Sequence, residues 1–127
     1  MTDLTSARTR LRDVLAEAFP DMTIHAVEPE QIRPPAVTIA PGDPWIDLTD
    51  DDHTMADIKV AWTVRVVVEA GPSTAVNNRL DAAAQALLNL IPDVELTSIS
   101  QPHTLVVSDT QAFPALTANL ATYTERT

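Results

Sequence analysis

The chain has 127 residues, a length typical of one domain that can bury a continuous core. Asp and Glu total 18 against 8 Lys and Arg, a net charge of −10 that repels phosphate backbones and argues against general nucleic-acid binding. There is no cysteine, which excludes thiol catalysis and thiolate zinc sites. With no apolar run long enough to span a bilayer and no signal-peptide pattern, we expect a soluble protein made and used without export.

The first third of the chain predicts one helix followed by two short strands. Apolar residues recur at helical spacing between residues 3 and 19, and Pro20 ends the pattern. Alternating side chains then predict one strand at residues 22–27 and another at residues 36–40, with prolines on both sides of the second.

Residues 41–56 form an acidic segment with a small apolar island at Trp45 and Ile46. Its carboxylates are Asp43, Asp47, Asp50, Asp51 and Asp52. Because these residues bury little apolar surface, we predict that 42–56 is a mobile loop that becomes ordered on assembly. Trp45 either caps the edge of the core or anchors a protein interface, where tryptophan is enriched.

The clearest pattern is a long strand followed by a helix. Residues 57–69 alternate strictly, and one face carries only large apolar side chains: Ile58, Val60, Trp62, Val64, Val66 and Val68. A Gly71-Pro72 break follows, and apolar spacing predicts a helix over residues 73–90 with Ser73 or Thr74 as its N-cap.

Three further strands are predicted at residues 96–99, 104–107 and 116–124. The whole order predicts a single α+β domain over residues 1–127. We expect a single mixed, mostly antiparallel β-sheet with two α-helices packed on one face.

The candidate chemistry is sparse. Asp50-Asp51-Asp52-His53 is the only cluster with metal-ligand character, but it lacks the glycine and closing glutamate of an EF-hand. There is no G-x-S-x-G elbow, and the histidines are far apart in sequence. We therefore predict a non-enzymatic protein with no metal and no other cofactor. A catalytic triad formed by distant contacts stays open, as does a small enzyme or ligand-binding domain with a cleft beside residues 41–56.

The second face of the long strand carries Lys59, Ala61, Thr63, Arg65 and Val67. This mixture is too polar for a core and too apolar for simple exposure, so it predicts contact with a partner. The full set of candidate interface residues is Trp45, Ile46, Asp50, Asp51, Asp52, Lys59, Arg65 and Val67.

The order of elements resembles the tail terminator family of long-tailed bacteriophages, small proteins of the head–tail junction. The resemblance is carried by the helix over residues 4–19, the strands at 35–39, 58–69 and 116–124, and the helix over 77–90. It implies a mixed α/β fold and a hexameric ring, with no catalytic residues to carry over. Other minor tail proteins and neck or head-completion proteins share this pattern, and a neck protein is the alternative within the same class.

The resemblance also implies the partners and the location. The ring caps the major tail tube protein and then binds the head connector, while DNA passes through the lumen without specific binding. The protein is therefore expected in the virion at the head–tail junction, and in the host cytoplasm during assembly, with no membrane partner. Whether the free protein is a monomer is left open.

Overall fold

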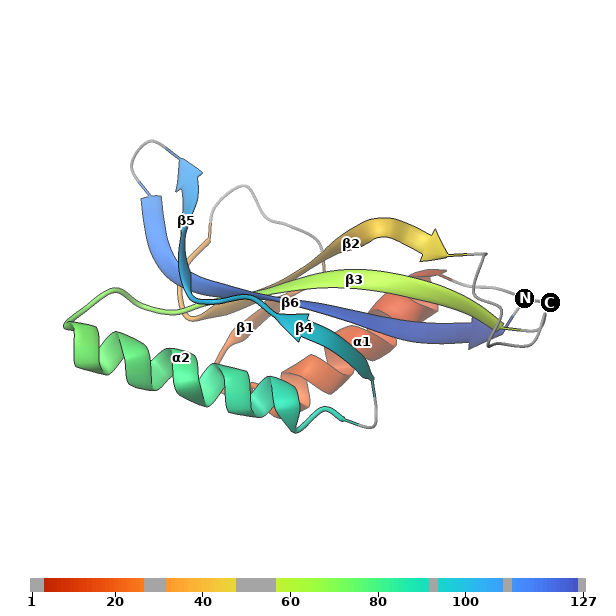
Figure 1. Cartoon of the computed structure of the whole chain (residues 1–127), viewed down its shortest axis with the longest axis horizontal. Coiled ribbons are helices and arrows are strands. Elements are labelled where there is room, and N and C mark those ends of the chain that lie inside the picture. The colour runs from red at the N-terminus through yellow and green to blue at the C-terminus, as the bar shows by residue number, and fades with distance from the viewer. Residues whose placement is uncertain (1–3, 27–31, 48–56, 92–93, 109–110, 126–127) are drawn as a thin grey trace.

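A computed structural model describes residues 4–26, 32–47, 57–91, 94–108 and 111–125. The elements in chain order are α1 (Leu4–Ala18), β1 (Thr23–His25), β2 (Ala36–Asp47), β3 (Asp57–Val67), α2 (Ser73–Leu88), β4 (Glu95–Ile99), β5 (His103–Ser108) and β6 (Gln111–Glu125). They form one six-stranded sheet in the order β1-β2-β3-β6-β4, with β5 also paired to β6 (Figure 1). Only β1 and β2 run parallel, and the other pairs are antiparallel, so the predicted mixed α+β fold is confirmed.

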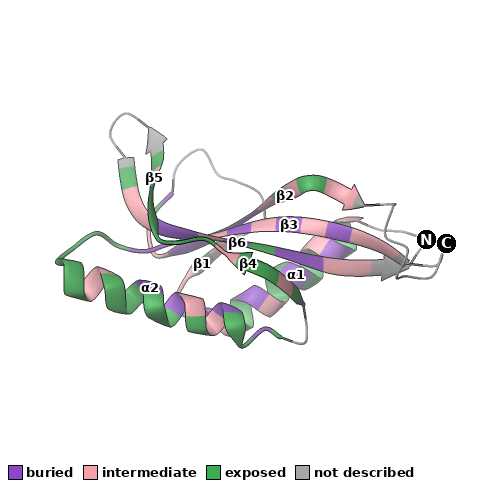
Figure 2. Cartoon of the chain, viewed as in Figure 1, coloured by how far each residue is buried: buried purple, intermediate pink, exposed green. Residues whose placement is uncertain are grey.

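Both helices pack on the same face of the sheet. Ala7, Leu11 and Leu15 of α1 and the apolar stripe of α2 join one buried cluster with the strands. The predicted core face of β3 is confirmed, because Val60, Trp62, Val64 and Val66 are at most 1% exposed. Figure 2 shows this burial along the middle of β3 and β6 and on the inner sides of the helices.

The start of α2 differs from the prediction. Pro72 is the N-cap residue, and no side chain caps the helix. The first intrahelical bond runs from the Val76 amide to the Pro72 carbonyl at 3.0 Å. Proline already holds φ near the helical value, so the helix begins without a hydroxyl cap at Ser73 or Thr74.

Strand β2 extends well past the predicted end at Ala40. It continues to Asp47, with a register shift between Pro41 and Ile46, so the predicted loop over residues 42–47 is wrong. Pairing with β1 ends at Thr38, and an outer edge that pairs with no described strand tolerates proline because no ladder donor is needed there. The remainder of the predicted loop, residues 48–56, lies outside the described residues.

Strand β6 begins earlier than the prediction of Leu116. Its pairing with β3 starts at Ala115, while residues 111–114 pair only with β5. The result is a two-stranded arm, β5 with the first residues of β6, that rises in Figure 1 on the side of the sheet away from α2.

A second, smaller cluster lies at the base of this arm. Ile32, Ala36, Val67 and Ala115 are buried there, and Leu105 and Phe113 of the arm pack against them. The cluster covers one end of the sheet face that the helices leave open.

Candidate interaction surface

The central part of the sheet face opposite the helices is covered by no described helix. Its residues come from three neighbouring strands and are small or polar in register: Thr38, Arg65 and Thr117 form one row, Ala40, Thr63 and Asn119 the next, and Ala61 pairs with Ala121. Most of these side chains are half-buried, Asn119 is exposed, and only Thr38 and Ala121 are buried. We call this set the open face. Small side chains project little from the sheet, so the backbone of another protein can approach this face closely.

Arg65 lies at the middle of the open face. It is half-buried on β3 between Thr38 of β2 and Thr117 of β6. A guanidinium presents several donors in a planar fork, which suits contact with a carboxylate or with backbone carbonyls of a partner.

Lys59 lies at the far end of the same face, within a small polar network. Its Nζ is 3.9 Å from Oε2 of Glu95 on β4, and the Tyr123 hydroxyl donates a hydrogen bond to that same oxygen. The Lys59 and Glu95 side chains are 27% and 48% exposed, so this ion pair contributes little to stability. The structure thus gives Lys59 a partner within its own chain.

Trp45 and Trp62 meet edge to face beneath the end of β2. Their ring centroids are 6.0 Å apart at an angle of 71°, and the Arg8 guanidinium lies 5.3 Å from the Trp62 ring. The Trp62 Nε1 donates to Oγ1 of Thr122 at 3.0 Å, whereas the Trp45 Nε1 and the Arg8 Nε are buried and have no hydrogen-bond partner among the described residues. Trp45 therefore packs against the edge of the core, as the first of its two predicted roles requires.

The remaining predicted interface residues separate into three groups. Ile46 is half-buried and pairs with Val60 across β2 and β3. Val67 is fully buried in the cluster beneath the arm, so its side chain is not available to a partner while the arm is in place. Asp50, Asp51 and Asp52, with His53, lie outside the described residues.

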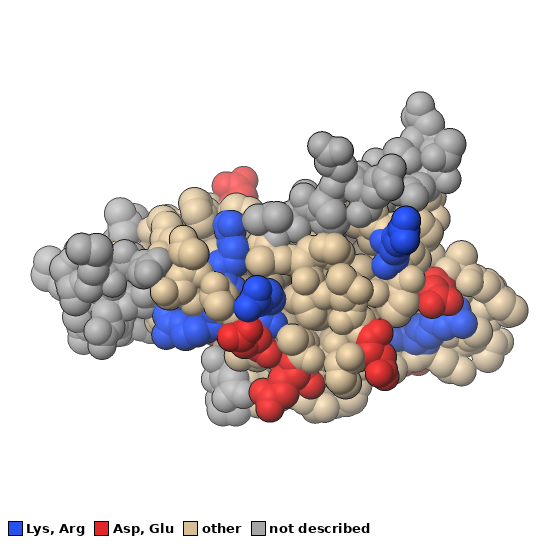
Figure 3. Space-filling model, turned by 180° about the vertical axis from the view of Figure 1, so that it is seen from behind, with Lys and Arg blue, Asp and Glu red and all other residues tan. Residues whose placement is uncertain are grey.

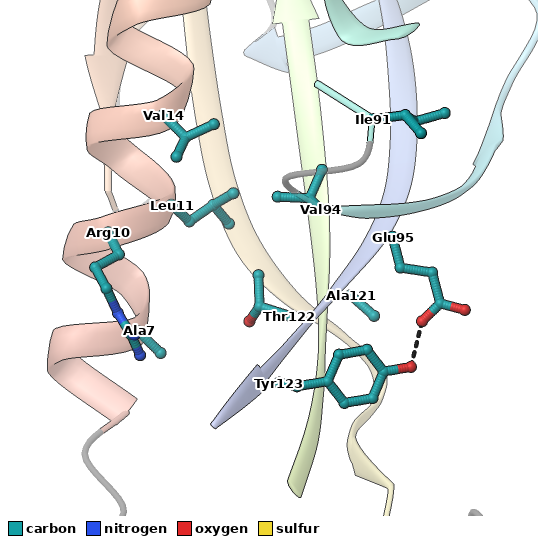
Figure 4. Close-up of a pocket in the computed structure, with 10 residues that line it drawn as sticks. All are labelled: Ala7, Arg10, Leu11, Val14, Ile91, Val94, Glu95, Ala121, Thr122 and Tyr123. Carbon is teal, nitrogen blue, oxygen red and sulfur yellow. Dashed lines mark hydrogen bonds between the residues drawn. The ribbon is translucent and has the colours of Figure 1, made fainter. Parts of the chain in front are cut away.

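One hollow lies at the edge of the open face, and a second, larger one lies beside α1. The smaller, about 250 Å³, has Ala61 and Ala121 on its floor and lies between the β2 bulge at Gly42–Pro44 and β4. The larger, about 530 Å³, lies between α1, the end of β6 and the residues Ile91, Val94 and Glu95 (Figure 4). Its lining is mostly aliphatic, with Arg10, Glu95 and Tyr123 as its charged and phenolic groups.

On the surface seen from behind the view of Figure 1, the charged side chains of the described residues do not form a patch of a single sign. Figure 3 shows basic and acidic side chains mixed in small groups over that surface. Such mixing provides no continuous basic track along which a phosphate backbone could bind.

Among the described residues, no three His, Asp or Glu side chains are close enough together to hold a metal ion. Neither described helix is long and apolar enough to cross a membrane.

No protein-family model matches the chain, and no curated protein sequence is significantly similar to it.

The sequence interpretation predicted the β5 strand of the arm at residues 104–107, but it missed the second strand of the arm, residues 111–114, and the larger hollow. A signal for the arm exists, because the polar pair Asp109-Thr110 separates two short apolar runs, as in a hairpin. The hollow depends on contacts between α1 and β6, which no local pattern reports.

Proposed function

We propose that this chain is a non-enzymatic virion assembly protein, a tail terminator that caps the phage tail tube and joins it to the head connector. The single observation that carries the proposal is the open face of the sheet. Both helices lie on the other side, and the uncovered strands present small residues around the half-buried Arg65. The order of elements on which the resemblance rests is present in the fold, with longer β2 and β6 strands.

In the proposed ring, the open face of one copy contacts a different surface of the next. Such a heterologous contact closes by rotation, and the expected hexamer has six times the 13.8 kDa mass of one chain. Arg65 is the first candidate at this contact, because the chain has many carboxylates that could meet it across the interface.

The acidic balance fits the same role. A net charge of −10 makes nonspecific attachment of DNA unfavourable, and DNA must pass through the lumen of a tail terminator without being held. The proposed partners are therefore further copies of the chain, the tube protein and the connector. DNA passes through the lumen without specific binding.

The experiment reverses the charge at Arg65. We expect Arg65→Glu to weaken ring formation or tube capping while the subunit stays folded, as judged by circular dichroism. Arg12→Glu is the matched control, because it makes the same charge change on the exposed surface of α1. If the Arg65→Glu variant caps tubes normally, and native mass spectrometry finds only the monomer under all conditions, the ring loses its support. A protein that bound connectors but never tube tips would instead be a neck or head-completion protein.

A further inference from the structure

We draw no further inference here: the strongest candidate, the hollow of about 530 Å³ between α1 and the end of β6, is lined mostly by aliphatic side chains, and nothing in the described residues shows what covers it.

Discussion

The substitution Trp→Phe should lower the free energy of unfolding much more at Trp62 than at Trp45. Trp62 is 1% exposed, donates a hydrogen bond to Thr122 and lies under the Arg8 guanidinium. Its replacement loses a hydrogen bond worth about 1 kcal/mol, part of a cation–π contact and the volume of the pyrrole ring. We expect Trp62→Phe to lower the free energy of unfolding by about 2–4 kcal/mol.

Trp45→Phe removes a group that has no hydrogen bond to lose. Within the part of the chain that the structure describes, the buried Trp45 Nε1 has no hydrogen-bond partner, and such a donor costs roughly 1–3 kcal/mol in the folded state. Phenylalanine retains the edge contact with Trp62 but buries less apolar surface than tryptophan. The free energy lost with that surface is similar to the free energy gained by removing the unpartnered donor, so the two effects nearly cancel. We expect the free energy of unfolding to change by less than about 1 kcal/mol.

The assay is urea unfolding followed by far-ultraviolet circular dichroism, because both substitutions alter tryptophan fluorescence. Thermal unfolding gives a second reading, with about 3–5 °C expected per kcal/mol for a chain of this length. Equal destabilisation by the two variants would refute the argument from the unpartnered Nε1. A folded Trp45→Phe variant that fails to cap tubes would instead assign Trp45 to an interface.

Two further stability predictions follow from close packing. A Cβ at Gly42 would lie 2.8 Å from the Ala61 Cβ and 2.9 Å from its carbonyl carbon, so Gly42→Ala should cost about 1–3 kcal/mol in chemical unfolding as the backbone shifts; an unchanged midpoint would contradict this. Val67→Ala should cost about 2 kcal/mol, since Val67 is fully buried, whereas Val106→Ala, 70% exposed, should change stability by less than about 0.5 kcal/mol. Equal losses at Val67 and Val106 would mean that the arm does not cover Val67.

The sequence predicted the central layer of the fold because periodicity reports which side of an element is buried. Strand β3 alternates without interruption, and its apolar face is the one that both helices cover. The helices over residues 4–18 and 73–88 were predicted within a few residues for the same reason.

The errors lie where proline occurs inside a strand. Pro41 marked the predicted end of the strand that begins at residue 36, but β2 continues through Pro41 and Pro44, and β6 likewise contains Pro114. Each of these prolines lies at a bulge or in a segment without a neighbour on both sides. Whether a strand lies at the edge of a sheet depends on distant partners, which a local pattern does not contain.

The candidate site was predicted only in part, for a similar reason. The alternation of β3 correctly assigned Lys59, Arg65 and Val67 to one face. It could not show that the arm and Ile32 bury Val67, or that Glu95 lies beside Lys59, because those contacts join segments far apart in the sequence.

The most direct test of the proposed function is the length and tip structure of tail tubes polymerised in vitro from the major tail tube protein. With the native chain present, we predict tubes that stop growing and carry a ring of this protein at one end in electron micrographs. With Arg65→Glu in its place, uncapped and longer tubes are expected. Tubes that grow to the same lengths with and without the native chain, and that carry no ring at either tip, would contradict the assignment as a tail terminator.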